Sequence, residues 1–256
     1  MDILSSLTPE GVSPIIAALV VFTSFFTSAL TASFGLGGGL ALLAVMSALL
    51  PPIAVIPVHG VAQLGANFSR FTLQRRDVVW PIILWFALGG VLGTALGGKI
   101  YVALPEALLR AGVGLFVLFT VWGPKPKAFA PGPTSFFLTG ALGAFLTMFF
   151  GATGPIAATM LSVTKLDRLK IVATHAACMV TQHALKTLAF GFLGFAFADW
   201  ALLIAAILIA GYLGAWSGVK LLRAMPEKQF RTGFRAVLTF FGVYLIAAGI
   251  YSALAK

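Results

Sequence analysis

The chain has 256 residues, of which 60% are hydrophobic and only 9% are charged, and its formal net charge is +10. A water-soluble domain needs far more polar surface to cover its core, so this composition excludes one and indicates a chain whose solvent is lipid. The seventeen Lys and Arg residues are scattered among loops between apolar segments and do not form one basic face. That distribution argues against a nucleic-acid-binding protein.

Apolar stretches of about twenty residues without period-2 alternation predict membrane helices, and a strand interpretation has no support. The first fourteen residues contain Asp2 and Glu10 but no Lys or Arg, unlike the basic start of a signal peptide. We therefore expect the first apolar run to be retained as a helix. Cys178 is the only cysteine, which excludes an intrachain disulfide and a two-cysteine redox pair.

In chain order there are five apolar segments, a linker and five more segments. The first five cover residues 14–33, 38–50, 53–73, 78–101 and 105–122, and the second five cover residues 134–150, 154–163, 169–190, 200–222 and 229–254. Residues 123–133 are rich in Pro and Gly and contain lysines, which is typical of a linker. The sequence thus predicts a first membrane repeat at 1–122 and a second at 134–256.

The two sets of segments carry matching residues in the same order. Glycine matches alone would be weak in so apolar a chain, but His, Lys, Arg and Pro-Glu also match, which indicates a duplication. Internal repeats of this kind are typical of secondary transporters. Phe34, Gly35, Gly38, His59, Gly90, Gly93, Gly97, Lys99, Pro105, Glu106, Arg110 and Gly112 match Phe150, Gly151, Gly154, His175, Gly211, Gly214, Gly218, Lys220, Pro226, Glu227, Arg231 and Gly233.

The distribution of basic residues favours inverted copies. The second segment of each copy is too short for an ordinary span. A single crossing by the first two segments would make the copies parallel and divide the basic residues ten to seven, so we favour two crossings or, as a re-entrant pair, none. Either way each copy reverses the side of the chain. Basic residues gather on the cytoplasmic side, so we predict that both termini lie outside the cytoplasm. Thirteen basic residues then share the cytoplasmic side: Arg70, Arg75, Arg76, Lys125, Lys127, Lys165, Arg168, Lys170, Lys220, Arg223, Lys228, Arg231 and Arg235.

A glycine-containing break precedes each short segment. A helix that starts inside the membrane has unpaired N–H groups and a positive partial charge at its first turn. Two such helices, at 38–50 and 154–163, are expected to face each other across a pseudo-two-fold axis and to hold an anion near the midplane. The alternative is close packing through small residues, which we prefer for Gly93-x-x-x-Gly97 and Gly214-x-x-x-Gly218.

A polar stripe marks the third segment of each copy. His59, Gln63, Asn67 and Arg70 lie on one helix face, and His175, Met179, His183 and Lys186 occupy the matched positions, with Gln182 beside them. Polar side chains at membrane depth usually face a cavity or a partner and mark a pathway. The alternative for each His is a simple bond to a neighbouring helix. Arg70 and Lys186 lie near helix ends, so we expect them to reach the membrane interface.

Other chemistry has little support in the sequence. The acidic residues sit at segment ends, which removes the usual carboxylate proton relay and sodium ligands. No catalytic motif for intramembrane hydrolysis occurs, and the histidines have no Cys, Asp or Glu at metal-ligand spacing. We therefore expect neither an enzyme nor a bound cofactor or metal.

The residues resemble the TauE/SafE family of sulfite and organosulfonate transporters over nearly the whole chain, from Pro14 to Leu254. The resemblance rests on the Phe-Gly-x-Gly-Gly-Gly break at Phe34–Gly39, its degenerate copy at Phe150–Pro155, and the Gly-x-x-Gly-x-x-x-Gly runs at Gly90–Gly97 and Gly211–Gly218. The second break has Thr153 and Pro155 where the first has Gly37 and Gly39, so the two half-sites need not contribute equally. The resemblance implies a multi-pass bacterial inner-membrane exporter of small sulfur oxyanions or sulfonates.

The expected partners are a small anionic substrate and the lipid bilayer, and the sequence specifies no oligomeric state. A sulfonate carries three acceptor oxygens, which suit helix N-termini and His, Gln and Asn donors. An anion channel, or a carrier of a different small organic anion, remains an alternative. The predicted substrate-binding set is Phe34, Gly35, Gly37, Gly38, Gly39, His59, Gln63, Asn67, Gly151, Thr153, Gly154, His175, Met179, Gln182 and His183.

Overall fold

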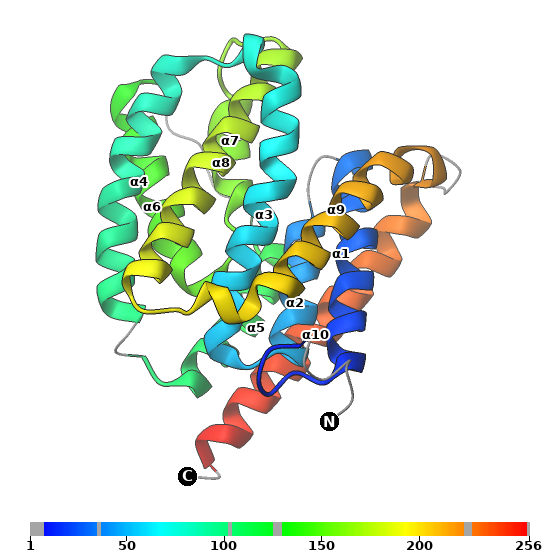
Figure 1. Cartoon of the computed structure of the whole chain (residues 1–256). Helices are drawn as coiled ribbons and strands as arrows, with labels where there is room; N and C mark the ends of the chain where they lie inside the picture. Colours follow the sequence, from blue (N-terminus) through cyan, green and yellow to red (C-terminus); the bar gives the residue numbers. More distant parts are fainter. Residues whose placement is uncertain (1–7, 35–36, 102–103, 125–129, 223–226, 255–256) are drawn as a thin grey trace. The chain divides into compact units, whose positions relative to one another are not determined.

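The computed structural model describes residues 8–34, 37–101, 104–124, 130–222 and 227–254, with the side chains of residues 33–34, 218–222 and 227–234 outside that description. Every regular element in this part of the chain is a helix (Figure 1). The α-helices are α1 Pro14–Phe34, α2 Gly38–Leu49, α3 Pro52–Gln74, α4 Trp80–Tyr101, α5 Glu106–Trp122, α6 Pro133–Phe150, α7 Gly154–Ser162, α8 Arg168–Phe192, α9 Ala201–Leu222 and α10 Glu227–Leu254; the 3₁₀ turns are η2 Arg75–Asp77 and η3 Phe197–Trp200.

The prediction of an all-α membrane protein is confirmed, and each of the ten predicted segments corresponds to one α-helix. Five helices are long and apolar enough to cross a bilayer: they lie in α1, α4, α6, in η3 with α9, and in α10. The predicted short second helices are also found, since α2 has 12 residues and α7 has 9. The long helices α3 and α8 are less apolar because they carry the polar stripes.

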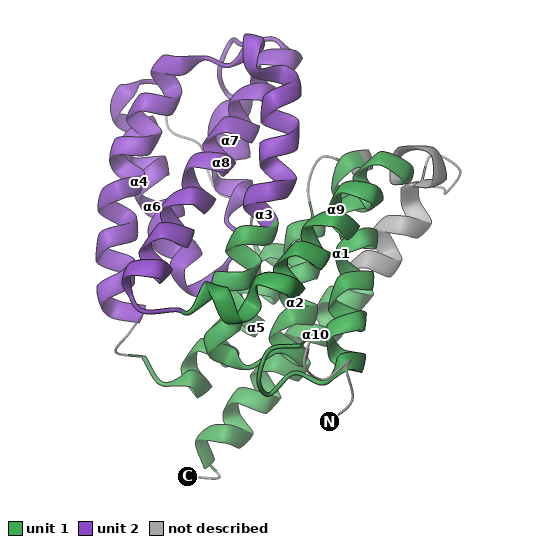
Figure 2. Cartoon of the chain, viewed as in Figure 1, with its two compact units in different colours: residues 1–62, 104–124, 196–256 green, residues 63–103, 125–195 purple. Residues whose placement is uncertain are grey.

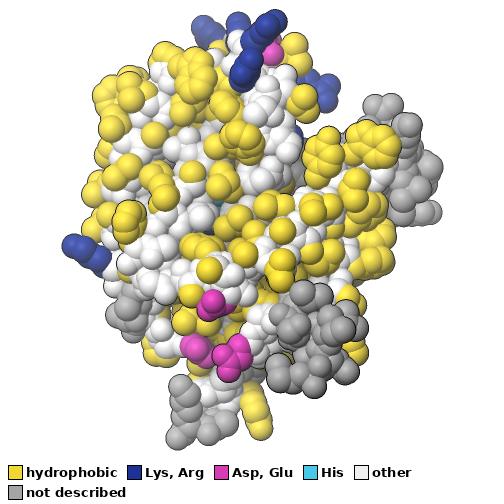
Figure 3. Space-filling view, viewed as in Figure 1, with side chains coloured by type: hydrophobic (Ala, Val, Ile, Leu, Met, Phe, Trp, Pro, Cys, Tyr) yellow, Lys and Arg dark blue, Asp and Glu magenta, His cyan; other side chains and the backbone are white. Residues whose placement is uncertain are grey.

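The protein surface matches a lipid environment. Large apolar side chains remain exposed along the helices, among them Phe22, Leu84, Leu115 and Trp216. Hydrophobic side chains cover much of the face seen in Figure 3, and the charged ones are sparse on it. In water such a surface would drive aggregation, whereas in a bilayer it meets acyl chains.

The helices cluster into two compact units, each containing helices from both halves of the sequence (Figure 2). Unit 1 comprises residues 1–62, 104–124 and 196–256, and in it α1 packs along α9 and α5 along α10. Unit 2 comprises residues 63–103 and 125–195, and in it α4 packs along α6 while α8 contacts α4, α6 and α7. The division of the sequence into repeats at 1–122 and 134–256, and the inversion of those repeats, stay predictions.

Glycines bring the long helices of each unit into close contact. A Cβ on Gly93 of α4 would overlap the Ala141 carbonyl of α6, and a Cβ on Gly214 of α9 would overlap the Phe25 carbonyl of α1. These two contacts join matched positions, because Gly93 matches Gly214 and Phe25 matches Ala141. The packing interpretation of these glycines is supported, since backbones this close leave no room for a side chain. Gly218 lies outside the described side chains.

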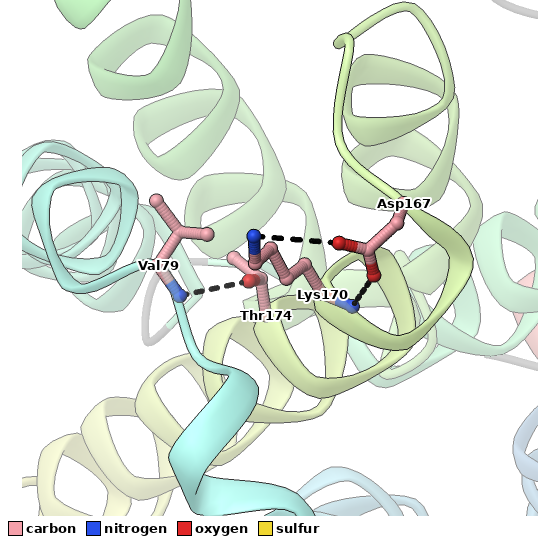
Figure 4. Close-up of polar contacts among 4 residues, drawn as sticks. All are labelled: Val79, Asp167, Lys170 and Thr174. Atoms are coloured by element: carbon pink, nitrogen blue, oxygen red, sulfur yellow. Dashed lines mark hydrogen bonds and ion pairs between the residues drawn. The ribbon is translucent and has the colours of Figure 1, made fainter.

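Unit 2 carries a cluster of exposed basic residues at the end where η2 meets α8. The cluster consists of Arg75, Arg76, Lys165, Arg168 and Lys170. Figure 3 shows Lys and Arg side chains gathered there. The backbone N–H of Val79 donates to the Thr174 hydroxyl over 3.1 Å, which ties the start of α4 to α8 (Figure 4). Asp167 caps α8 by accepting from the Lys170 N–H, and this hydrogen bond lowers the pKa of its carboxyl group. Lys125 and Lys127, also predicted to be cytoplasmic, lie outside the described residues.

The glycine contacts predict a difference between two alanine substitutions in α4. Gly93→Ala should lower the melting temperature in detergent by several degrees, because its methyl group meets backbone that cannot move aside. Gly98→Ala is the matched control: its methyl group would lie 3.6 Å from Leu193 Cδ1, an ordinary contact. The control should be neutral or stabilising by up to about 1 kcal/mol. The melting temperatures are measured by tryptophan fluorescence. Equal values for Gly93→Ala and Gly98→Ala would contradict the packing role of Gly93.

The basic cluster predicts the orientation of unit 2. Arg76→Cys and Lys165→Cys, each on a Cys178→Ser background, should react with a membrane-impermeant maleimide only from the cytoplasmic side. Lys99→Cys should react only from the opposite side, because it lies near the far end of α4, roughly 30 Å away along the helix. All three native side chains are exposed, so access does not limit labelling. Reaction of all three positions from one side would contradict this topology.

Candidate functional site

The break between α6 and α7 ends one helix and begins the next within a few residues. Gly151 caps α6 in the left-handed conformation, with φ 69°, which glycine adopts without strain. Thr153 then precedes the first turn of α7, and Pro155 lies in that turn, where its missing N–H removes no helical bond. The chain therefore ends one helix and starts another inside unit 2.

Three polar side chains of α8 hold this break. The Lys186 ammonium donates to the Gly151 carbonyl over 3.1 Å, and the Gln182 amide donates to the Thr153 hydroxyl over 2.8 Å. The His175 Nε2 lies 3.2 Å from the Gly154 carbonyl. Since a carbonyl only accepts, Nε2 carries the hydrogen. The stripe predicted from sequence thus lies against the break.

The Thr153 hydroxyl links the break back to α6. It accepts from Gln182 and donates to the Gly143 carbonyl over 3.0 Å. Gly143 leaves room for this arrangement, because a Cβ there would lie 2.9 Å from the Gln182 Oε1. Gly143, Thr147 and Gly151 follow one another at four-residue spacing along α6, so they share one face of that helix. Gly143 and Thr147 were missed in the sequence analysis, although this spacing was visible in it.

Lys186 corrects one expectation from the sequence. We expected it to reach the membrane interface, yet its side chain is 0% exposed and points to the break. The expectation was wrong because a position near a helix end says nothing about which neighbour packs over it. Arg70, the matched residue, is half-buried and donates to the Asn67 side chain on its own helix.

In the first break, between α1 and α2, fewer side-chain contacts lie within the described residues. Gly37 precedes α2 with φ 104°, a conformation that favours glycine, whereas Thr153 at the matched position has φ −105°. The His59 Nε2 donates to the Gly39 carbonyl over 2.8 Å, and the His59 side chain is 0% exposed. The predicted site residue Gly35 and the side chain of Phe34 lie outside the described residues.

The remaining predicted residues divide into two groups. On α3, the Asn67 amide donates to the Gln63 carbonyl over 2.7 Å, a bond within the helix itself. On α8, Met179 belongs to a buried apolar cluster and its sulfur lies beside Gly154, while His183 is buried. The structure therefore brings Gly151, Thr153 and Gly154 together with His175, Met179 and Gln182. The described hydrogen bonds of the Gln63 carbonyl and the Asn67 side chain stay within α3.

Comparison with known proteins decides the family. The family model described as "Sulfite exporter TauE/SafE" matches residues 20–245 of the chain. The chain belongs to the TauE/SafE family. A Haemophilus influenzae protein described as "Probable membrane transporter protein" is 29% identical over 230 residues, which covers 84% of this chain and 88% of the relative. No solved structure matches.

Membership of the TauE/SafE family, with five apolar helices long enough to span a bilayer, makes this chain a multi-pass transporter of the bacterial inner membrane. The resemblance stated from the sequence is confirmed. A transporter needs polar groups inside an apolar protein, and the break between α6 and α7 with the α8 side chains is a buried polar cluster among the described residues.

The two break glycines have different surroundings and should respond differently to alanine. A Cβ on Gly38 would overlap the Thr27 carbonyl of α1, so Gly38→Ala should lower the melting temperature in detergent. A Cβ on Gly154 would lie 3.5 Å from the Met179 sulfur and 3.8 Å from the His175 Nε2, which are ordinary contacts. Gly154→Ala should fold normally but transport more slowly, since its methyl group occupies space over the α7 N-terminus. Wild-type transport by folded Gly154→Ala would contradict a role of the space over the α7 N-terminus in transport.

Proposed function

We propose that this TauE/SafE transporter exports a small sulfur-containing anion: sulfite, or an organosulfonate such as sulfoacetate, isethionate or a taurine-derived product. The α6–α7 break with the polar stripe of α8 is the anion-binding element. One observation carries this proposal: the break combines a helix N-terminus with buried hydrogen-bond donors, and no acidic side chain contacts it among the described residues. Such a site is electropositive.

The chemistry of the break suits an oxyanion. The first N–H groups of α7 and its dipole favour a negative charge in front of Gly154. His, Gln, Thr and Lys side chains supply further donors, and hydrogen bonds to a charged acceptor are stronger than those between neutral groups. A sulfonate group presents three acceptor oxygens and can accept from several of these donors at once. The family description, which names sulfite, supports the same class of substrate.

The charge of the substrate also supports export without a coupling ion. Moving one negative charge outward gains about 2.3 kcal/mol per 100 mV of inside-negative potential. At roughly 150 mV this gain amounts to about 3.5 kcal/mol, enough for a gradient of a few hundred-fold. The described acidic residues all lie at helix ends or in turns, so the described helix interiors hold no carboxylate to carry protons or sodium ions. Electrogenic uniport of a monoanion needs neither.

Reconstituted protein tests the proposal. Proteoliposomes loaded with sulfite, sulfoacetate, isethionate, taurine or sulfate should show saturable efflux of at least one sulfur monoanion, faster under an inside-negative potassium diffusion potential. Zwitterionic taurine should not respond to that potential, because it carries no net charge. Protein-free liposomes are the control for passive leak. Absence of saturable flux for every sulfur anion, with protein that is folded and inserted, would refute this substrate class.

A further inference from the structure

We propose that the Lys186 ammonium is the fixed positive charge that selects an anionic substrate. In the protein without a bound anion, the ammonium donates its hydrogen bond to the Gly151 carbonyl instead. This inference deepens the proposed function, on which it rests. Lys186 was not among the substrate-binding residues predicted from the sequence. Through its charge, Lys186 is a specificity-determining residue of the α6–α7 break.

The first argument is the missing counter-charge. Lys186 is completely buried within unit 2, and no acidic side chain pairs with it among the described residues. Of the described acids, Glu10, Glu106, Asp167 and Asp199 are exposed and Asp77 is half-buried in η2. A buried charge without a partner is strongly unfavourable, and intramembrane cations are therefore found paired or on a transport pathway. A bound anion is the partner that Lys186 lacks.

The second argument is the incomplete hydrogen bonding around the ammonium. Lys186 has three N–H donors, and the described bonds use one of them, on the Gly151 carbonyl. The Thr147 hydroxyl, one turn before Gly151, is also buried and has no hydrogen-bond partner among the described residues. A helical threonine usually donates to the carbonyl four residues earlier, but that carbonyl, of Gly143, accepts from Thr153 here. Two buried donors beside the break are thus available to an acceptor-rich ligand.

The third argument is the position of the ammonium relative to α7. Gly151 lies three residues before Gly154, where α7 begins, so the ammonium and the positive end of a helix dipole act on the same short segment. The two effects have the same sign and favour the same ligand charge. At the matched position in the first half of the sequence, Arg70 is engaged by Asn67 instead. Among the described hydrogen bonds, the charged side chain that contacts the break is therefore that of Lys186.

A structural role is the competing explanation, since Lys186 also satisfies the Gly151 carbonyl at the α6 end. The two roles differ in what they require. A structural donor needs only an N–H group, so Lys186→Gln should keep the structural role. A charge-selecting residue needs the ammonium, so both Lys186→Gln and Lys186→Met should lose the selective binding of anions. Removing an unpaired buried charge should leave the melting temperature of the empty protein unchanged or raise it.

The experiment is calorimetric titration of the purified full-length transporter in detergent with sulfite, isethionate, acetate and chloride. For whichever anion the wild type binds, Lys186→Gln and Lys186→Met should bind about 10- to 100-fold more weakly, because a hydrogen bond to a charged group is lost. Lys170→Met is the matched control: it removes a lysine charge from the same helix, where Lys170 is exposed and pairs with Asp167. The control should bind like the wild type.

The outcomes separate this inference from the proposed function. Affinity of folded Lys186→Gln and Lys186→Met within three-fold of the wild type would overturn the role of Lys186 while leaving sulfur-anion export intact. Binding of acetate but of neither sulfur anion, lost in both variants, would support Lys186 and refute the sulfur substrate. Lower melting temperature in Lys186→Met with normal binding in Lys186→Gln would assign Lys186 to structure. If Lys186→Met fails to fold, the Lys186→Gln titration alone decides between the two roles.

Discussion

The chain must satisfy backbone hydrogen-bonding groups at the place where it interrupts a helix inside an apolar protein. At the end of a helix the last carbonyls lose their intrahelical donors, and a bilayer offers no water to replace them. Between α6 and α7 a replacement comes from α8, whose Lys186 donates to the carbonyl of Gly151, the residue that caps the end of α6. This requirement explains why α8 is the most polar of the helices in unit 2 and yet is largely buried.

The helix pairs α1–α9 and α4–α6 meet a different requirement, since they need close contact between backbones. Gly93 on α4 and Gly214 on α9 let the helix backbones approach so closely that a carbonyl of the partner helix occupies the space of a side chain. Where α1 donates from the Ser24 hydroxyl to the Ile207 carbonyl of α9, α6 has Gly140 packed over the matched carbonyl of Phe86. The two helix pairs thus make close contact at matched positions by different means, which is compatible with the predicted duplication.

The sequence predicted the helices well because each one is bounded by strong signals: apolar length, Pro, Gly and charged turns. It also predicted that the breaks and the polar stripes bind the substrate, which stays a prediction. It failed for Lys186, because helical periodicity gives the face of a residue but not the neighbour covering that face. The binding role that it assigned to Gly38 stays a prediction, but it missed that Gly38 lies directly over the Thr27 carbonyl, a contact between segments that spacing along the chain does not reveal. The combination of helices from both halves within one compact unit was likewise invisible to a residue-by-residue comparison.

The two breaks differ in the way they are built, and the difference has a functional meaning. The first uses backbone freedom: Gly37 adopts a conformation that other residues avoid, and among the described residues His59 alone contributes a side-chain bond to it. The second uses side chains, since Thr153 takes an ordinary conformation and is fixed by Gln182. Backbone groups bind any small anion of suitable size, whereas a particular set of side chains discriminates between ligands. A transporter that keeps its packing contacts and changes the side chains at one break can therefore alter its substrate without rebuilding its fold, and under the proposed function the selection among anions should reside in the residues of α8.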